Sequence, residues 1–550
     1  MDVKLNCNIA KKCNSCQLNN LSYSEQLKFK QSKCRKFLGS FAKVEPIIGM
    51  KTPFSYRNKA QAVFKVQRDK SIVWGLYKST TNSVVVTTNC RLHTQHSNEI
   101  FNTLCKLFKS FKISIYDPYK GTGFLKSVVV REGFSSKECM VIINGADAIF
   151  PAKKTFVSAL LKNHPYITTI VTTVNKDRKK LFVGKTQDVL YGEGYITDVL
   201  CGKTFIISPQ SFYQINPVQT QKLYNKAIEL ADLDGTQTVL DSYCGVGTIG
   251  ICLSDKAKTV LAVESNEDAI KDAKKNAKLN LVKNIEFVCA DAKYYIQSLK
   301  NENIKIDVAF VDPPRSGCSK EFLQSVIDMD IQKVVYISCN VETQSRDIRF
   351  LKANGYKVLH IQPVDMFPHT NHVESIALLT KADTMLRIAK KTDAEKIANL
   401  MRYVYDNLED KSIYVCDDLQ FIKSHIEENG LGVVACNKES EIIANLILRF
   451  PHHSDDNLGR DINLEKSELL RVAHMETAVV HPRYRGKALQ KQMLNYAEKL
   501  INTDKYNILL ATVSPKNIPS CKTFEGCGYK KVLTKEKYGG LKRHIYMKKL

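Results

Sequence analysis

The feature that most constrains the fold of this chain is an alternation of apolar runs and helical segments that begins near residue 205. The apolar runs are TVLDSYCGVGTIGICL, TVLAVES, NIEFVCAD, IDVAFVDPP and KVVYISC, in chain order from residue 238 to residue 339. Segments such as NEDAIKDAKKNAKLN, at 266–280, lie between them and have the composition of helices. Strand–helix–strand repeats of this kind predict a doubly wound, mostly parallel sheet with helices on both faces.

A glycine-rich turn follows the first of these strands, and an acidic residue ends the next. In Asp241-Ser-Tyr-Cys-Gly-Val-Gly-Thr the glycines allow the backbone to approach a ligand closely. Glu264 ends the following strand, where a carboxylate can accept hydrogen bonds from ribose hydroxyls. A plain structural turn and a dinucleotide site are the alternatives, because GVGTIG matches G-x-G-x-x-G by its letters. The acidic residue before the turn, in the pattern D-x-x-x-G-x-G, is more typical of S-adenosylmethionine enzymes.

Reactive residues also follow later strands of the series. Asp312 begins a rigid Asp-Pro-Pro-Arg loop at the carboxyl end of a strand, where doubly wound folds bind ligands. Cys339 ends KVVYISC, and Glu374 ends the polar loop PVDMFPHTNHVE just before the apolar run SIALLT. Taken singly, the loop is also explained as a turn, and the thiol as a core cysteine. Together, a thiol and a carboxylate at one crevice supply a nucleophile and a general base.

The amino-terminal part has a different pattern. Cys7, Cys13 and Cys16 have the spacing C-x5-C-x2-C, and the start of the chain lacks the apolar segment of a secretory signal. A disulfide framework is therefore not expected from the 17 cysteines. Thiolates suit both an iron–sulfur cluster and zinc, and ordinary buried cysteines are a third interpretation. From about residue 17 to residue 200, short runs such as KAQAVFKV and CMVIING predict antiparallel sheet with a few helices.

The charge of the chain indicates a polyanionic partner. The formal net charge is +25, of which +18 falls on residues 1–385 and +7 on residues 386–550. A generally basic proteome or a solubility effect is the alternative explanation. There is no uncharged apolar run long enough to span a bilayer, so we expect a cytoplasmic protein with no membrane partner.

The last part of the chain, 386–550, begins a new α/β pattern. METAVV, at 475–480, has the composition of a strand, and HPRYRGKA then leads into the helical segment LQKQMLNYAEKL. Backbone N–H groups at the start of such a helix suit a pyrophosphate. This pattern predicts a second ligand-binding unit.

Seven motifs carry a resemblance that covers about residues 5–381: CNIAKKCNSCQ, FSYRNKAQAVF, SPQSFYQIN, DSYCGVGTIG, FVDPPRSG, YISCNVETQSRDI and DMFPHTNHVE. In this order they resemble the bacterial RNA uracil-C5 methyltransferases that make 5-methyluridine. The resemblance is closest to the 23S ribosomal RNA enzymes without a TRAM domain. It implies that Cys339 is the nucleophile that adds to uracil C6 and that Glu374 is the general base. The positions that it matches to S-adenosylmethionine binding are Gln214, Tyr243, Glu264 and Asp312, with Thr248 and Asp291 as looser matches.

The same resemblance gives the amino-terminal cysteines a role. In the ribosomal RNA members, three cysteines so spaced and a distant fourth bind a [4Fe-4S] cluster, which implies Cys7, Cys13, Cys16 and Cys90 as ligands here. We also expect RNA contacts from two basic segments, Tyr56-Arg57-Asn58-Lys59 and Lys126 to Arg131. The expected partner is RNA, most directly 23S ribosomal RNA. A transfer RNA substrate is one alternative, and an RNA-binding ribosome-assembly module with incidental methylation is another.

Residues 386–550 resemble GNAT-type acetyltransferases. The segment Arg-Tyr-Arg-Gly-Lys-Ala matches the R-x-x-G-x-A signature, and Asn517 to Tyr529 matches the second cofactor segment. The resemblance implies acetyl-coenzyme A bound at Val480, Arg485, Gly486, Ala488 and Asn517. Glu476 is a candidate base, with a plain strand-face carboxylate as the alternative, and the acceptor amine is unknown.

The predicted fold is therefore α/β, with four domains in one chain. They are an iron–sulfur region at 1–95, a central β-rich RNA-binding domain at 96–200, a Rossmann-like S-adenosylmethionine-dependent methyltransferase domain at 201–382, and a GNAT domain at 386–550. The amino-terminal region is expected to be mainly antiparallel β or α+β. We expect a monomer that has methyltransferase activity and N-acetyltransferase activity.

Overall fold

The computed structural model describes residues 3–78, 83–147, 150, 152–176, 184–437 and 439–550. The chain forms two compact units, Met1–Lys381 (unit 1) and Ala382–Leu550 (unit 2). Among the described helices, none has both the length and the apolar character needed to cross a bilayer.

The carboxyl-terminal part of unit 1 contains the predicted doubly wound sheet, which is confirmed. Its strand order is β12-β11-β10-β13-β14-β16-β15. The first five pair in parallel, and β16 lies antiparallel between β14 and β15. The strands are β10 Thr238–Ser242, β11 Thr259–Glu264, β12 Ile285–Cys289, β13 Val308–Val311, β14 Lys333–Ser338, β15 Tyr356–Val364 and β16 Glu374–Lys381.

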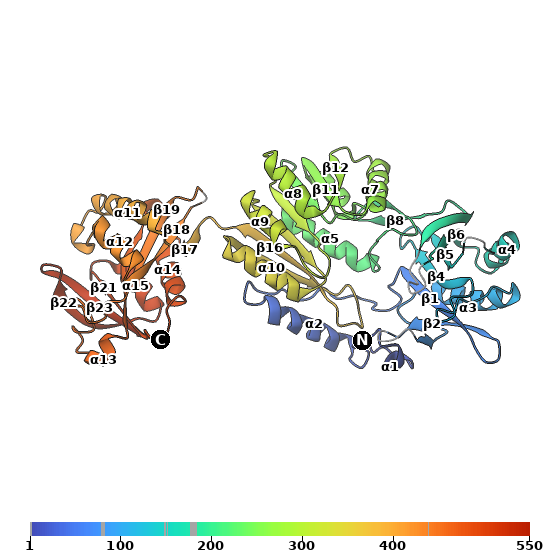
Figure 1. Ribbon diagram of the computed structural model, residues 1–550, viewed down its shortest axis with the longest axis horizontal. Coiled ribbons are helices and arrows are strands. Elements are labelled where there is room, and N and C mark those ends of the chain that lie inside the picture. The colour runs from blue at the N-terminus through green and yellow to red at the C-terminus, as the bar shows by residue number, and fades with distance from the viewer. Residues whose placement is uncertain (1–2, 79–82, 148–149, 151, 177–183, 438) are drawn as a thin grey trace. The chain divides into compact units, whose positions relative to one another are not determined.

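Helices bury both faces of this sheet (Figure 1). They are α5 Pro217–Ala231, α6 Thr248–Leu253, α7 Glu267–Leu279, α8 Ala292–Asn301, α9 Lys320–Asp328 and α10 Val341–Ala353, with the 3-10 turn η1 Ser254–Lys256. Side chains alternate along each strand, so Val239 belongs to the apolar core on one face and Leu240 to the core on the other. The Asn266 side chain caps α7 by accepting from the backbone N–H groups of Asp268 and Ala269. This cap starts the helix directly after β11 and so fixes where the β11 strand end lies.

A second seven-stranded sheet occupies the middle of unit 1, in the order β3-β2-β1-β4-β5-β6-β7. All neighbours are antiparallel except β5 and β6. Its strands are β1 Lys59–Val66, β2 Ile72–Tyr77, β3 Val84–Val86, β4 Leu125–Glu132, β5 Cys139–Gly145, β6 Ile167–Val174 and β7 Lys185–Tyr191. The helices α3 Gln95–Ser110 and α4 Lys153–Asn163 belong to this part, and the hairpin β8 Ile196–Leu200 and β9 Lys203–Ile207 follows. The sheet takes strands from both sides of residue 95, the predicted boundary between the first two domains.

The first residues of the chain pack against the last strands of unit 1. After the short helix α1 Ala10–Cys13, helix α2 Tyr23–Leu38 begins at a capping box formed by Ser22 and Glu25. Helix α2 contacts α10 and β15, and it lies beside α10 in Figure 1. Residues 44–48 then continue alongside β15, with bridges from Val44 to Ile361 and from Ile48 to Val364. The amino-terminal segment is thus built onto the edge of the doubly wound sheet.

Unit 2 is a seven-stranded sheet in the order β17-β18-β19-β20-β21-β23-β22. Its strands are β17 Met385–Ile388, β18 Gly430–Cys436, β19 Ile442–Arg449, β20 Val472–Val480, β21 Ile508–Val513, β22 Lys530–Lys537 and β23 Leu541–Lys549. Its helices are α11 Ala394–Asp406, α12 Leu419–Glu427, α13 Lys466–Leu469, α14 Leu489–Glu498 and α15 Ile518–Gly526, with 3-10 turns η2 Lys391–Asp393, η3 Lys411–Ile413 and η4 Pro482–Tyr484. Only β20 and β21 are parallel, and they pair only over 472–474 and 508–510. Beyond these residues the two strands no longer pair, which opens the sheet at its centre.

Candidate functional site

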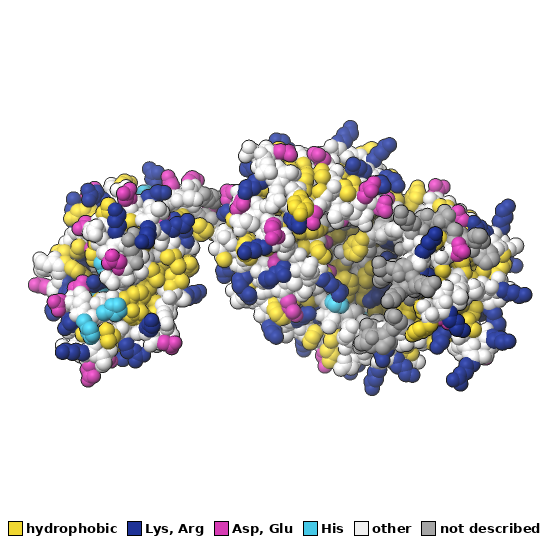
Figure 2. Space-filling view, in the orientation of Figure 1, with side chains coloured by type: hydrophobic (Ala, Val, Ile, Leu, Met, Phe, Trp, Pro, Cys, Tyr) yellow, Lys and Arg dark blue, Asp and Glu magenta, His cyan; other side chains and the backbone are white. Residues whose placement is uncertain are grey.

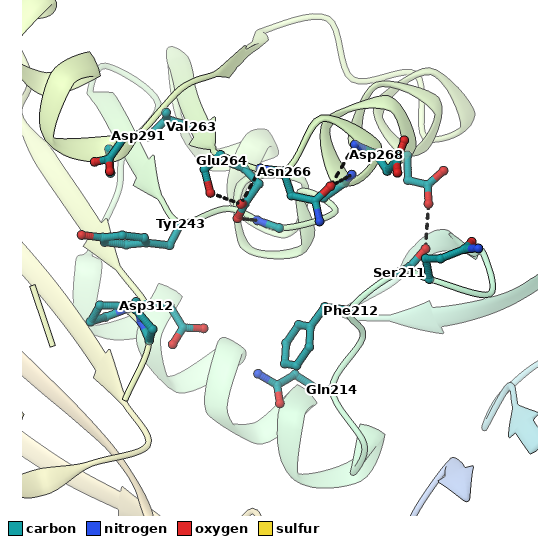
Figure 3. A pocket seen from close by; sticks show the side chains of 18 of the residues that line it. Ser211, Phe212, Gln214, Tyr243, Val263, Glu264, Asn266, Asp268, Asp291 and Asp312 are labelled. Carbon is teal, nitrogen blue, oxygen red and sulfur yellow. Dashed lines mark hydrogen bonds between the residues drawn. The ribbon is translucent and has the colours of Figure 1, made fainter. Parts of the chain in front are cut away.

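A cavity of about 1540 Å³ lies at the carboxyl ends of the parallel strands of unit 1. Figure 2 shows unit 1 hollowed on the visible face, with Lys and Arg side chains spread over the surrounding surface. The cavity is lined by seven of the residues predicted from the sequence: Gln214, Tyr243, Glu264, Asp291, Asp312, Cys339 and Glu374. Figure 3 shows Tyr243 and Asp312 facing Phe212 and Gln214 across the open space, with Glu264 at the adjoining wall. The fold of unit 1 therefore brings together residues that are up to 160 positions apart in the chain.

The glycine-rich turn orients the Glu264 carboxylate. Gly245 donates its N–H to Glu264 Oε2 at 3.3 Å, and Asn266 donates its N–H to Oε1 at 2.9 Å. Gly245 and Gly247 have φ of +55° and +79°, which the turn requires and which a glycine adopts at little cost. Beneath the turn, Asp241 accepts the N–H of Gly250 at 2.8 Å, and burial raises the pKa of Asp241 to about 7. The carboxylate at the end of β11 is thus held by backbone donors at the cavity wall.

Strand register places the thiol and the second carboxylate opposite each other. Ser338, the last residue of β14, pairs with Ser375 on the antiparallel strand β16. Cys339 is one residue beyond Ser338, and Glu374 is one residue before Ser375, so the two form the next cross-strand position. Glu374 is buried, with 4% of its surface exposed, and both side chains line the cavity.

The electrostatics of this pair favour neutral forms in the absence of a ligand. Burial, and next the Asp312 carboxylate, raise the pKa of Glu374 to about 8, against a lowering effect of Arg315. Burial, followed by Glu374 and Asp312, raises the pKa of the Cys339 thiol to about 11, and Arg315 again opposes the rise. Burial also raises the pKa of Asp312 to about 7. A positive charge that enters the cavity will therefore stabilise the ionised forms of all three groups.

Comparisons with known proteins agree with this geometry. The family described as tRNA (Uracil-5-)-methyltransferase matches residues 183–382, and the acetyltransferase (GNAT) family matches residues 398–529. An uncharacterized RNA methyltransferase of Caldanaerobacter subterraneus is 39% identical over 382 residues, which are 68% of this chain and 84% of that protein. One from Clostridium tetani is 38% identical over 378 residues, 68% of this chain and 82% of that protein.

A solved structure is similar as well. The Pyrococcus abyssi tRNA (uracil-54, C5)-methyltransferase, in complex with S-adenosyl-L-homocysteine, has a TM-score of 0.57 and 30% identity. The match covers 66% of this chain and 85% of that one. The chain belongs to the RNA uracil-5-methyltransferase family. Its unit 2 is a GNAT domain.

Other residues of this RNA uracil-5-methyltransferase also line the cavity, although the sequence did not predict them as site residues. They are aromatic or basic and come from the quoted motifs: Phe212, Arg315, Phe367 and His372. Phe212 is 68% exposed, and it lies two residues before Gln214 in the SPQSFYQIN motif. Of the two looser candidates, Asp291 lines the cavity and Thr248 does not. The Thr248 hydroxyl instead lies 3.2 Å from the Tyr224 hydroxyl of α5.

The four predicted cluster cysteines, Cys7, Cys13, Cys16 and Cys90, line a separate cavity of about 260 Å³. The charged side chains of Arg57, Lys59 and Arg91 line the same cavity. Burial and the nearby Cys90 thiol raise the pKa of Cys16 to about 12. Within the described part of the chain, no three His, Cys, Asp or Glu side chains lie close enough to hold one metal ion. The four thiols thus share a space without converging on a point.

The two basic segments expected to contact RNA are largely structural, and that expectation is wrong for Tyr56, Lys126 and Arg131. All three are buried. Tyr56 donates its hydroxyl to the Pro368 carbonyl at 3.1 Å, and Lys126 donates to the Asn175 carbonyl at 2.6 Å. Arg131 donates to the carbonyls of Ser208 and Ser211 at 2.9 and 2.8 Å. These donors satisfy loop carbonyls beside the cavity, so they are not available to phosphates.

The residues predicted for acetyl-coenzyme A lie where β20 and two helices meet. Val480 ends β20, and Ala488 and Asn517 are the N-cap residues of α14 and α15. The Gln490 side chain donates to Ser520 Oγ at 2.8 Å, which ties the starts of these two helices together. Arg485 and Gly486, whose φ is +81°, lie in the turn between β20 and α14.

Glu476 of β20, the candidate base of unit 2, is held in a charged cluster. Its Oε1 accepts from His474 Nδ1 at 2.7 Å and from Arg449 Nε at 3.1 Å. His474 Nε2 accepts the N–H of Leu458 at 3.1 Å, so its proton lies on Nδ1 and points to Glu476. Burial favours the neutral carboxyl, but His474 and Arg449 outweigh it and lower the pKa of Glu476 below its ordinary value.

Proposed function

We propose that this protein methylates C5 of a uracil in RNA with S-adenosylmethionine as methyl donor, Cys339 as nucleophile and Glu374 as general base. The observation that carries the proposal is the opposed position of Cys339 and Glu374 at adjacent strand ends, on the cavity that Tyr243 and Glu264 also line. Membership of the RNA uracil-5-methyltransferase family supports the reaction class.

The chemistry requires both groups. Uracil C5 is a poor nucleophile, and addition of the Cys339 sulfur to C6 makes C5 enolate-like. Once C5 has accepted the methyl group, its proton has to leave before the C6–S bond can break. The Glu374 carboxylate takes that proton, the C6–S bond breaks, and elimination releases the Cys339 thiolate and the methylated base. The target uracil has to be unstacked from its neighbours to reach Cys339 in the cavity.

S-adenosylmethionine supplies the methyl group as a sulfonium. Glu264 would accept hydrogen bonds from its ribose, Tyr243 would lie against it, and Gln214, Asp312 and Asp291 line the same space. The solved relative carries S-adenosyl-L-homocysteine, the demethylated product, in its own structure. The positive charge of the sulfonium would also lower the pKa of Cys339, whose neighbours are carboxyl groups.

The test is substitution of Cys339 by Ala in the full chain, assayed for 5-methyluridine in RNA. Methyl transfer is expected to disappear while RNA binding remains measurable. Cys289, an exposed cysteine at the end of β12, provides the matched control, and Cys289→Ala is expected to keep wild-type activity. Full activity of Cys339→Ala contradicts the nucleophile assignment.

We further propose that the substrate is 23S ribosomal RNA and that the amino-terminal cysteines hold a [4Fe-4S] cluster. A cluster binds each thiolate to a different iron, so its ligands lie farther apart than those of one zinc ion. The four cysteines line one cavity, which supports a shared metal group, and the cations of Arg57, Lys59 and Arg91 in that lining would balance its negative charge. Iron and acid-labile sulfide content after anaerobic purification test the cluster, with zinc content as the contrary result. Mapping 5-methyluridine in ribosomal and transfer RNA of a deletion strain tests the substrate.

For unit 2 we propose acetyl-coenzyme A binding and N-acetylation of an amine acceptor. The adjoining starts of α14 and α15 support it, since they direct N–H groups from both predicted cofactor segments to one place. Calorimetric titration with acetyl-coenzyme A is expected to show binding that Arg485→Ala weakens. Binding without transfer to any amine would make unit 2 a binding module.

A further inference from the structure

A fully buried ion pair joins the amino-terminal helix α2 to the loop that leads into Glu374. Lys30 Nζ donates to Asp365 Oδ1 at 2.5 Å, and neither side chain has exposed surface. The same ammonium donates to the Phe367 carbonyl at 2.9 Å. The Tyr23 hydroxyl, about two turns earlier on the same face of α2, donates to Asp365 Oδ2 at 2.8 Å. None of these side chains lines the cavity, so the reaction described above does not use them.

Asp365 is held at every polar atom. Its N–H donates to the Ile48 carbonyl at 3.0 Å, and its carbonyl accepts from Gln219 Nε2 at 3.0 Å. With Tyr23 and Lys30 on the carboxylate, four residues from three parts of the chain (α2, residue 48 and α5) contact Asp365. Removing two charges from water is costly, and an apolar pair of the same volume would pack at least as well. A pair of this kind therefore points to a requirement for geometry.

The geometry concerned is that of Glu374. Val364, the residue before Asp365, is the cross-strand partner of Glu374 in the β15–β16 register. Residues 365–373 connect these two positions, and Phe367 and His372 of this loop line the cavity beside Glu374. Asp365 thus directly follows the backbone position that pairs with Glu374, so its placement affects where the Glu374 carboxyl lies.

Further contacts from the same amino-terminal segment hold the middle of the loop. His369 has a φ of +69°, which costs free energy in a non-glycine residue. Gln26 Oε1 accepts its N–H at 2.9 Å, and Gln26 Nε2 lies 3.1 Å from His369 Nδ1. The His369 carbonyl accepts the N–H of Leu18, two residues after Cys16, at 3.0 Å. The cysteine-bearing segment and α2 together enforce a loop conformation that the loop would not keep alone.

We infer that Lys30, Asp365 and Tyr23 are positioning residues for the proton-abstraction step, because they fix the loop end against which Glu374 lies. This inference rests on the proposed function of Glu374. A misplaced base slows removal of the C5 proton but leaves addition of Cys339 and methyl transfer possible. The methylated covalent adduct should then accumulate relative to free product, since methyl transfer precedes the slowed step.

The experiment measures, for the full chain with its RNA substrate, the turnover rate, the KM for S-adenosylmethionine and the ratio of denaturation-stable methylated adduct to product. Lys30→Met is expected to lower kcat by up to about a hundredfold, as misplacement by 1 Å can, with the KM nearly unchanged. Tyr23→Phe removes one hydroxyl and keeps the packing, so it should fold and should show a smaller loss with a raised adduct ratio. The double variant Lys30→Met/Asp365→Leu is expected to recover stability without recovering kcat.

Tyr356→Phe is the matched control, because Tyr356 is buried at the opposite end of β15 and its hydroxyl donates to the Ile331 carbonyl at 2.6 Å. It should lower stability without changing the adduct ratio. Wild-type kcat and adduct ratio in both Lys30→Met and Tyr23→Phe would overturn the inference, as would a parallel loss of adduct and product in both. Full activity of Cys339→Ala would instead overturn the proposed function, so the two failures can be told apart.

Discussion

Two glutamates, one on a strand of each unit, have opposite electrostatic surroundings. Glu374 begins β16 and Glu476 lies within β20, and the sequence made each a candidate base. Glu374 is buried beside another carboxyl, and its pKa rises to about 8. Glu476 is bonded to His474 and Arg449, and its pKa falls. Both carboxyls lie on strands, and their neighbours decide what each can do.

The difference teaches how to recognise a base in such a fold. A general base is most effective when its pKa lies near the working pH, because it is then both available and basic enough. Glu374 meets that condition, and its surroundings would ionise it further when a cation enters. Glu476 remains ionised and tightly paired, which suits a carboxylate that holds β19 and β20 together. We therefore propose proton transfer at Glu374 and a structural role at Glu476.

Loss of the Glu374 carboxylate should have the largest effect. Glu374→Gln keeps the shape but removes the base, so turnover is expected to fall by about 10²–10⁴-fold. Because methyl transfer precedes proton removal, a covalent RNA–protein adduct should accumulate and survive denaturation. Gel analysis with methyl-labelled cofactor measures it. Glu342→Gln, on the exposed first turn of α10, is the control. An active variant without adduct would remove Glu374 from the role of base.

Replacing each of the two glutamates by Gln should change the stability of its unit in opposite directions. The pKa of Glu374 is higher in the folded than in the unfolded chain, so its contribution to stability declines as the pH rises from about 4.5 to 8. Glu374→Gln should therefore stabilise unit 1 most near pH 8. Glu476 has a lowered folded pKa, so its contribution is present at neutral pH and is lost on acidification. Glu476→Gln should destabilise unit 2 by about 1–3 kcal/mol at pH 7. Hydrogen exchange resolved by unit, at pH 5 and pH 8, measures both, and a change of the same sign in the two variants would contradict the comparison.

Arg315 affects the pKa values of both Cys339 and Glu374. Its charge lowers the pKa of both Cys339 and Glu374, so Arg315→Gln should raise both. The basic forms then appear at higher pH, and the rise of kcat with pH should move to alkaline values by less than about one pH unit. The profile is measured at saturating S-adenosylmethionine and RNA. Lys320→Gln, on the next helix, is the control, and an unmoved or acid-shifted profile in Arg315→Gln would mean that Arg315 does not act on this pair.

Much of the fold and of the methyl-transfer site could be predicted because strand periodicity decides both. The apolar runs placed Asp312, Cys339 and Glu264 at carboxyl ends of strands, and a parallel sheet brings such ends to one edge. The cross-strand position of Cys339 and Glu374 could not be predicted, since it depends on the antiparallel insertion of β16 between β14 and β15. The series of parallel strands gives no signal for that insertion.

The burial of Lys126 and Arg131 is the main feature that could not be predicted from the sequence. Lys126 lies on the same face of β4 as Val128 and Val130, and Arg131 lies on the opposite face with Val129. Here both faces of the strand are covered, and loop carbonyls accept from the charged groups instead. The sequence also gives no sign of the Lys30–Asp365 pair, because 335 residues separate its members. Contacts between distant charged residues leave no local pattern.

The smallest expected effect concerns acetyl transfer in unit 2. If Glu476 is structural, Glu476→Gln should leave the affinity for acetyl-coenzyme A unchanged, because the predicted cofactor residues lie at the starts of α14 and α15 rather than at the Arg449–His474 cluster. Any acetylation of a small amine should keep its pH dependence, since a carboxylate with a lowered pKa is already ionised throughout the neutral range. Calorimetric titration and a thiol-release assay, both at a temperature where the variant remains folded, measure the two quantities. A loss of transfer with unchanged cofactor binding would return Glu476 to the role of base and would remove the contrast with Glu374.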